Sequence, residues 1–119
     1  MIVQADRRRL EIGEDISAVA AFDVAVARLR DAALDAARAL QEVARSKTYR
    51  LAGCSSPVDF AVTRRIDRRT ARELLNLGAA CELAPSVEPA VREGRLSVGD
   101  AARVGHLRRY GEQIAAAEW

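Results

Sequence analysis

Apolar residues recur at helical spacing through the first half of the chain. From about Ser17 to Lys47 no proline or glycine interrupts them, and they alternate in steps of three and four residues, as in a heptad repeat. The pattern predicts a helix over 17–47, about 45 Å long at ~1.5 Å per residue. We call its eight apolar positions the apolar stripe: Val19, Phe22, Val26, Leu29, Ala33, Ala36, Leu40 and Val43.

A helix of this length must cover its apolar stripe with another element. Either the rest of the chain packs on it or a second copy does, and the two arrangements are compatible. The alanine-rich stretch 32–39 would let a partner helix approach closely. Because heptads sustained over more than three repeats usually pair with another helix, we expect a homodimer through the apolar stripe.

The next segment changes to short helices separated by turn signals. Gly53 can end the long helix, and Ser56 followed by Pro57 is typical of an N-cap with proline at the first helical position. We therefore expect a short helix over 57–64.

A second helix is predicted to follow after a turn of about three residues. Asp67 can cap it, and apolar residues at helical spacing extend it over 68–83. Two consecutive helices joined by so short a turn have the length pattern of a helix-turn-helix.

The last third predicts two more helices. Ser86 can cap a short one that ends at Gly94, and Ser97 can cap another that Gly111 interrupts. Residues 112–119 resume a helical composition and stop without a capping signal, as expected of a piece of a longer chain.

Composition agrees with an all-α fold. The 119 residues include 24 Ala and 18 Arg, whereas Gly and Pro together number 10, a balance that favours helices over turn-rich β architectures. No low-complexity linker divides the chain. We expect a single domain over 1–119, in which one long N-terminal helix is followed by a compact cluster of four or five short helices over 56–119, including the helix-turn-helix-like pair.

Several functional classes are disfavoured by what the chain lacks. No run approaches the ~20 apolar residues that span a bilayer, and the N-terminus has no apolar signal-peptide core, so we expect a cytoplasmic protein with no membrane partner. Cys54, Cys81 and the single His106 are too few for a structural zinc site or for a nucleophile beside a base. We expect no catalytic site, metal or cofactor within these residues, and no small-molecule substrate is indicated.

Positive charge is concentrated in the middle of the chain. Residues 45–72 carry eight basic and two acidic side chains, whereas the segments before and after each have a net charge of −2. Arginine forks bind phosphates, and release of condensed counterions favours association with DNA. The predicted DNA contacts are Lys47, Arg50, Arg64 and Arg65 on the backbone, with Arg68, Arg69 and Arg72 in the major groove.

Double-stranded DNA is the expected partner, because only five aromatic residues are available for the base stacking that single strands require. The alternative interpretation of the arginines is a solvated face that keeps a small protein soluble.

Residues from about 40 to 107 resemble the 13E12-repeat family, helical domains found ahead of HNH endonuclease modules. The resemblance rests on segments 49–56, 66–75, 83–85 and 91–97, together with Phe60, Ala101 and Ala102. The Gly-Arg-Leu-Ser sequence of 94–97 also resembles the helix-turn-helix region of the ParB partition family. Both resemblances imply a helical module associated with nucleic acid. The chain has neither the histidine cluster of an HNH module nor a ParB nucleotide-binding motif, so neither family's catalysis is implied.

Two functions are compatible with these patterns. The first is a non-catalytic, helix-turn-helix-like DNA-binding protein, either a regulator or the DNA-associated front module of a nuclease-type protein whose catalytic part would lie beyond Trp119. The alternative is a protein-interaction or assembly module that acts through the long helix and has no nucleic-acid role.

Overall fold

The computed structural model describes residues 16–108 in full, and for 2–15 and 109–118 it gives only the helix to which they belong. Helices are the only regular elements of this part of the chain, as the sequence predicted. They are α1 (Ile2–Ser46), the 3-10 helix η1 (Thr48–Arg50), α2 (Pro57–Thr63), α3 (Arg68–Leu83), α4 (Val87–Arg92) and α5 (Val98–Glu118).

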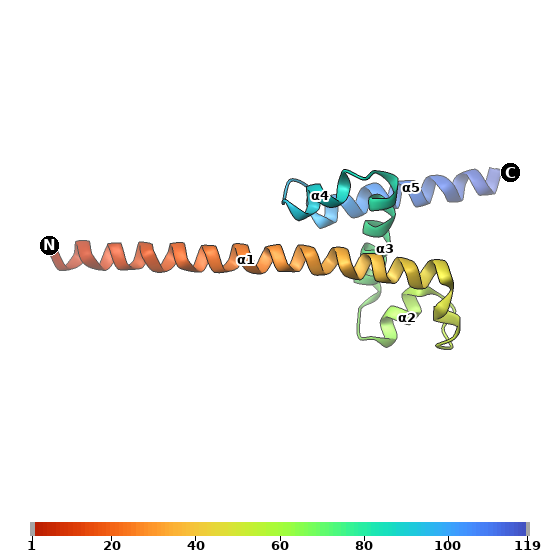
Figure 1. The fold of residues 1–119 in the computed structure, drawn as a ribbon, viewed down its shortest axis with the longest axis horizontal. Helices are drawn as coiled ribbons and strands as arrows, with labels where there is room; N and C mark the ends of the chain where they lie inside the picture. The colour runs from red at the N-terminus through yellow and green to blue at the C-terminus, as the bar shows by residue number, and fades with distance from the viewer. Residues whose placement is uncertain (1, 119) are drawn as a thin grey trace.

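The helices are arranged around the C-terminal half of α1. In Figure 1, α3 crosses α1, with η1 and α2 on one side of α1 and α4 and α5 on the other. α3 packs against both α1 and α5, so it is the central element of the fold.

Two apolar clusters form the core where α3 crosses its neighbours. The first joins α1 and α3 to α4 and α5 through Leu34, Ala37, Leu77, Ala80, Val87, Val91 and Ala101. The second joins α1 to α2 and α3 through Leu40, Ala61, Ala71 and Leu75. Because many of these residues are alanines, the helices can approach closely.

Local capping sets the starts of three helices. The side chains of Ser56, Asp67 and Ser97 each accept a hydrogen bond from the backbone amide three residues later, at 2.8–3.0 Å. These caps confirm the predicted starts. Ser86 makes no such bond, so the prediction of a side-chain cap there is wrong, although α4 itself is present.

Two predicted boundaries differ from the structure, and a third agrees. α1 begins at Ile2, well ahead of Ser17. It ends at Ser46, next to the predicted end at Lys47, whose left-handed φ of 58° turns the chain into η1 well before Gly53. The break expected at Gly111 falls beyond residue 108, outside the described side chains, and the bounds of α5 run past it.

The face of α1 that packs on the body is displaced from the apolar stripe. Its buried residues are Leu34, Ala37 and Leu40, of which only Leu40 belongs to the stripe. Of the other stripe positions, Val26, Ala33 and Val43 are half-buried, and Val19, Phe22, Leu29 and Ala36 are exposed. The chain therefore covers the C-terminal part of α1 but leaves the stripe open over its first described turns.

Candidate nucleic-acid interface

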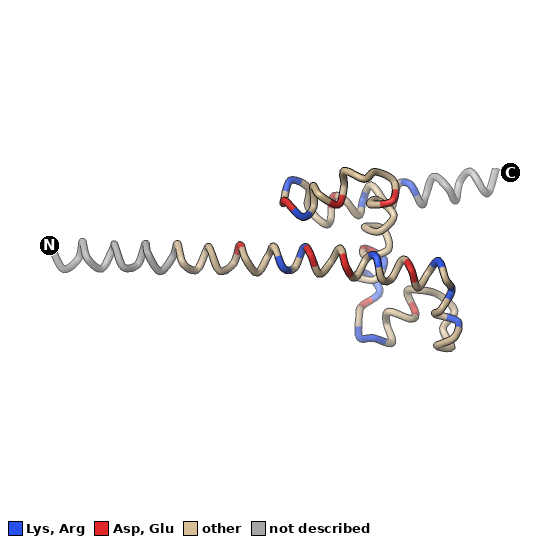
Figure 2. Tube along the Cα trace, viewed as in Figure 1, with Lys and Arg blue, Asp and Glu red and all other residues tan. Residues whose placement is uncertain are grey.

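All seven predicted DNA contacts lie in one region of the molecule. We call η1, α2, the turn after α2 and the first turns of α3 the basic lobe (residues 47–72). In Figure 2 its Lys and Arg positions gather at two places, around η1 and around the turn between α2 and α3. The structure brings Arg64, Arg65, Arg68, Arg69 and Arg72 together at the turn and the start of α3. Lys47 and Arg50 form a separate group at η1, across α2 from the others.

The pairing of the cations distinguishes this lobe from the rest of the molecule. Elsewhere, five arginines form ion pairs: Arg38, Arg45, Arg92, Arg95 and Arg103. Within the basic lobe Arg68 is paired with Asp59, at 2.8 Å. The other six predicted contacts form no ion pair with a described carboxylate. Arg28 and Arg30 of α1 likewise form no ion pair within the described part of the chain. The basic lobe therefore carries a positive charge that the chain does not neutralise itself.

Two of these cations sit on strained backbone. Lys47 and Arg65 have φ angles of 58° and 67°, the only positive values among described residues other than glycine. Arg65 ends α2 in a Schellman motif, in which its amide bonds to the Val62 carbonyl at 3.0 Å and the Ile66 amide bonds to that of Ala61 at 3.2 Å. Glycine is the usual residue at this position, and another residue there costs about 1–2 kcal/mol. Strain of this kind often accompanies function.

Aromatic rings position two further arginines. The Arg64 guanidinium lies 4.9 Å from the centre of the Phe60 ring, and that of Arg50 lies 6.0 Å from the Tyr49 ring. A guanidinium stacked on a ring keeps its N–H edge free for a phosphate.

Two aspartates organise the turn between α2 and α3. A hydrogen bond from Ser55 is the main reason that the pKa of Asp59 is lowered, and bonds from Arg68 and Ser56 lower it further. The pKa of Asp67 is lowered mainly by its hydrogen bonds with Thr70. Both carboxylates are therefore ionised at neutral pH, and Asp59 holds the Arg68 side chain.

The first turns of α3 are accessible to a large partner, whereas the middle of the helix is not. Arg68, Arg69 and Arg72 are exposed, whereas Leu75 and the residues 77–80 are buried against neighbouring helices. An α3 that enters a DNA groove would have to do so by its N-terminal end, which is the end that recognition helices present to base edges.

Sequence reasoning missed a contribution from α5. Arg103 and His106 line a cleft together with Arg69, Arg72 and Asn76 of α3. These residues come together only because α5 crosses α3, and no local pattern around Arg103 indicates it.

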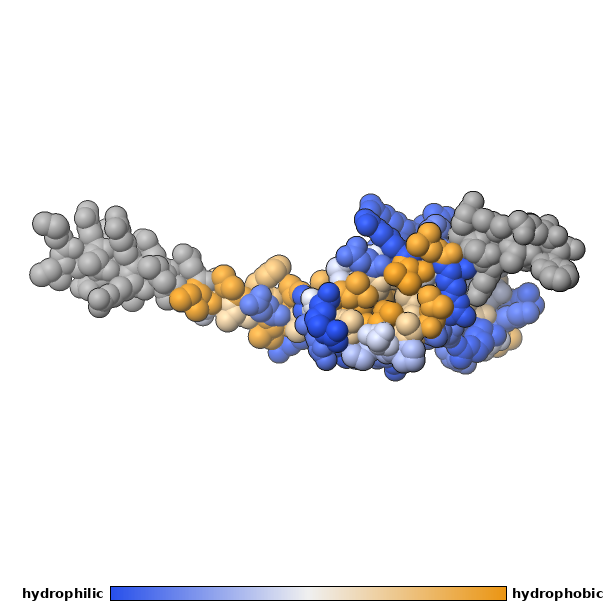
Figure 3. Space-filling view, turned by 90° about the horizontal axis from the view of Figure 1, so that it is seen from above, coloured by the Kyte–Doolittle hydropathy of each residue, from blue (hydrophilic) through white to orange (hydrophobic). Residues whose placement is uncertain are grey.

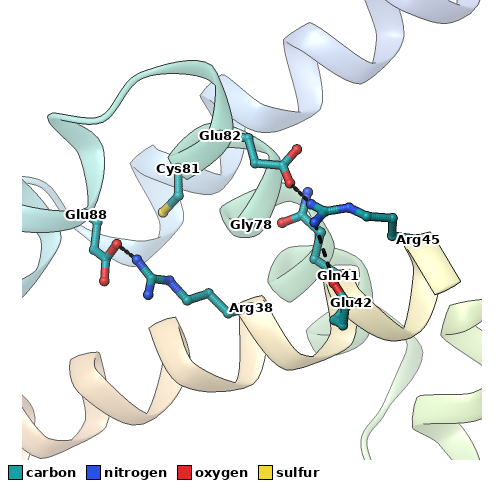
Figure 4. Close-up of a pocket in the computed structure, with 8 residues that line it drawn as sticks. All are labelled: Arg38, Gln41, Glu42, Arg45, Gly78, Cys81, Glu82 and Glu88. Carbon is teal, nitrogen blue, oxygen red and sulfur yellow. Dashed lines mark hydrogen bonds and ion pairs between the residues drawn. The ribbon is translucent and has the colours of Figure 1, made fainter.

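A second cavity, between α1 and α3, has its charges mutually satisfied. It has a volume of about 310 Å³, and its ion pairs join Arg38 to Glu88 and Arg45 to Glu82 (Figure 4). Burial raises the pKa of the Cys81 thiol there, and the nearby Arg38 and Arg92 only partly oppose this effect. The ion pairs in this cavity hold α1 against α3 and α4.

The described residues contain neither a membrane-spanning helix nor a metal-binding cluster. No helix in this part of the chain is long and apolar enough to cross a membrane. Within 16–108 there is no cluster of three or more His, Cys, Asp or Glu side chains able to hold a metal ion.

Comparisons of the chain with protein-family models, with curated proteins and with solved structures found no match. The resemblance to the 13E12-repeat and ParB families therefore stays a prediction.

Proposed function

We propose that this protein binds double-stranded DNA through its basic lobe, without catalysing a reaction there. The observation that carries the proposal is the contrast in pairing: four arginines elsewhere (Arg38, Arg45, Arg92 and Arg95) are held closely by carboxylates of the same chain, whereas six of the seven predicted contacts form no ion pair with a described carboxylate. Unpaired, exposed cations on one lobe are what a polyanion can neutralise. A regulator, or the DNA-associated front module of a nuclease-type protein, would use such a lobe.

The lobe supports different roles for its residues. Arg64 and Arg65 at the turn bind backbone phosphates, and the α3 N-terminus brings Arg69 and Arg72 to the groove. Lys47 and Arg50 at η1 provide a second contact further along the duplex. Arg68 contributes less, because a phosphate has to compete with Asp59 for its guanidinium.

Fluorescence anisotropy with a random-sequence duplex at several salt concentrations tests the proposal. The parent should bind with a strong salt dependence, and replacing Arg64 and Arg69 by Gln should lower the slope of log K against log salt by about 0.9 for each lost contact. The double variant with Arg28→Gln and Arg95→Gln is the matched control, because it removes the same charge from exposed sites outside the lobe. Absence of binding at low salt, or equal losses in the two double variants, would overturn the proposal.

The exposed part of the apolar stripe favours a second candidate function, assembly through α1 with a second copy of the chain. Val19, Phe22 and Leu29 are 59%, 68% and 69% exposed. Figure 3 shows apolar residues along α1 from its first described turns to the body of the molecule. The stripe runs into a groove of about 490 Å³, where Val26 and Leu29 of α1 face Leu96 and Val98. A homodimer through α1 is compatible with DNA binding by the lobe, and it would present two lobes to one duplex.

Light scattering and the DNA titration together separate the two functions. Phe22→Asp should dissociate a dimer formed through the stripe, whereas Leu51→Asp, at an apolar site 89% exposed outside the stripe, should not. A dimer without DNA affinity would favour assembly alone, and a monomer at tens of micromolar would exclude assembly through the stripe.

A further inference from the structure

A cleft of about 440 Å³ lies between the N-terminal parts of α3 and α5. Three arginines line it: Arg69 and Arg72 from α3, and Arg103 from α5. Arg72 and Arg103 are 31 positions apart along the chain, so the cluster exists only in the folded protein.

The crossing of the two helices holds this cluster in place. Gly105 packs directly on the α3 backbone at Asn76, and Ala101 and Ala102 are buried beside it. The stems of the arginines are thus attached to two helices whose separation cannot change easily.

The charges in the cleft do not cancel. Arg69 and Arg72 form no ion pair with a carboxylate of residues 16–108, and Arg103 makes only a long contact of 3.7 Å to Asp100 in its own turn. Glu73 is the one carboxylate among the residues that line this cleft. Without an anion, three guanidinium groups face one carboxylate, and their mutual repulsion is relieved only by solvent and salt.

We propose that this cleft binds a phosphodiester group of the nucleic-acid backbone, so that the DNA contact continues from the basic lobe onto α5. The proposal rests on the proposed DNA-binding function and adds Arg103 as a specific contact. Arg69 and Arg72 belong to both surfaces, so a duplex held by the lobe passes the cleft. Guanidinium forks from two directions can bind the two non-bridging oxygens of one phosphate.

The exposure of the cluster favours a polyanion over a free anion. All three arginines are exposed, and the Arg103 side chain is 84% accessible. A small anion at such a site competes poorly with water. A backbone phosphate is instead delivered by neighbouring contacts on the same strand, which raise its effective concentration.

The test uses the full chain and random-sequence duplex. Arg103→Gln should weaken binding several-fold at 0.1 M salt and lower the salt slope by about 0.9. The matched control is Arg95→Gln, since Arg95 is also exposed but lies outside the cleft and pairs with Glu93. Glu73→Gln should strengthen binding, because it removes the opposing carboxylate.

The outcomes separate the two proposals. If the parent binds and Arg64→Gln lowers the slope but Arg103→Gln does not, the cleft proposal fails and the lobe stands. If the parent does not bind any duplex, the proposed function itself fails. Titration with inorganic phosphate at constant ionic strength tests whether the cleft binds a free anion instead. Thermal stabilisation at low millimolar phosphate that disappears in Arg103→Gln would identify a free-anion site and overturn the backbone assignment.

Discussion

Gly105 of α5 packs directly on the backbone of Asn76 in α3, so that a Cβ on Gly105 would lie 2.6 Å from the Asn76 carbonyl carbon. It would also lie 2.9 Å from the Ala80 amide nitrogen. Both neighbours are helical backbone and cannot rotate away. We therefore expect Gly105→Ala to destabilise the protein by about 1–3 kcal/mol, measured by urea unfolding.

Gly99→Ala is the control for this substitution. Gly99 also lies in α5, but nothing surrounds the position of its Cβ within 4 Å. Alanine there should leave stability unchanged or raise it by up to about 1 kcal/mol, because alanine is the better helix former. Equal losses in the two variants would mean that the close crossing of α3 and α5 is not what Gly105 provides.

Arg65→Gly should raise the stability of the protein and lower its affinity for DNA. Glycine adopts the left-handed φ of 67° without steric cost, so the strain is relieved, but the unfolded chain gains entropy. The net effect should be a stabilisation of about 1 kcal/mol or less. Affinity for duplex should fall at the same time, because a phosphate contact is lost.

Arg64→Gly separates charge from backbone conformation. Arg64 has a φ of −95°, which any residue adopts, so glycine there relieves no strain and should destabilise the protein. Thermal melts and anisotropy on both variants check the prediction. A loss of stability in Arg65→Gly as large as that in Arg64→Gly would contradict it.

The sequence predicts the helix ends that depend on neighbouring residues. α2 and α3 start as predicted because Ser56 and Asp67 form caps with amides only three residues away. The predicted end of α1 at 47 is also confirmed, since the helix ends at Ser46, but the chain leaves it through the left-handed Lys47, a conformation that lysine does not favour, and not at Gly53. The start of α1 was misplaced because the helix continues through Gly13, a residue that weakens a helix without ending it.

Tertiary contacts decide which face of a helix is buried where the spacing of apolar residues does not. Apolar residues lie on more than one face of α1, so spacing alone does not choose between Ala33 and Leu34 as the buried position. The packing of α1 on the body decides it, since Leu34 lies in the first apolar cluster with Leu77 and Val91. The cleft arginine Arg103 is likewise brought to α3 by a helix crossing, which no motif encodes. The basic lobe was predictable because its charges are close in sequence.

The core assignment predicts a large difference between two leucines of α1. Leu34 is 1% exposed within the first apolar cluster, whereas Leu29 is largely exposed. Leu34→Ala should cost about 2–5 kcal/mol of unfolding free energy. Leu29→Ala should change the stability of the monomer by less than about 0.5 kcal/mol. Urea titrations at low protein concentration make the comparison, and a large loss from Leu29→Ala at that concentration would place the core elsewhere.

Acidification should weaken the turn between α2 and α3. The pKa of Asp59 is lowered in the folded protein, so its ionised form contributes stability above the unfolded pKa of about 3.9, and this contribution is lost as pH falls through the folded value. Asp59→Asn does not titrate. The stability difference between the parent and Asp59→Asn should therefore be larger at pH 7 than at pH 3, measured by chemical unfolding. A difference independent of pH would mean that the charge of Asp59 is not what stabilises the turn.

The thiol of Cys81 should titrate above its ordinary range. Cys81 packs against the first apolar cluster, and burial raises its pKa more than the charges of Arg38 and Arg92 lower it. In a Cys54→Ser background, the pH dependence of iodoacetamide alkylation should therefore have a higher midpoint in the folded protein than in urea. The midpoint is the informative quantity, because steric protection slows alkylation without moving it. Arg38→Gln should raise the midpoint further, whereas Arg28→Gln, whose arginine does not contribute to this shift, should leave it unchanged. A folded midpoint at or below the unfolded one would show that the two arginines outweigh burial.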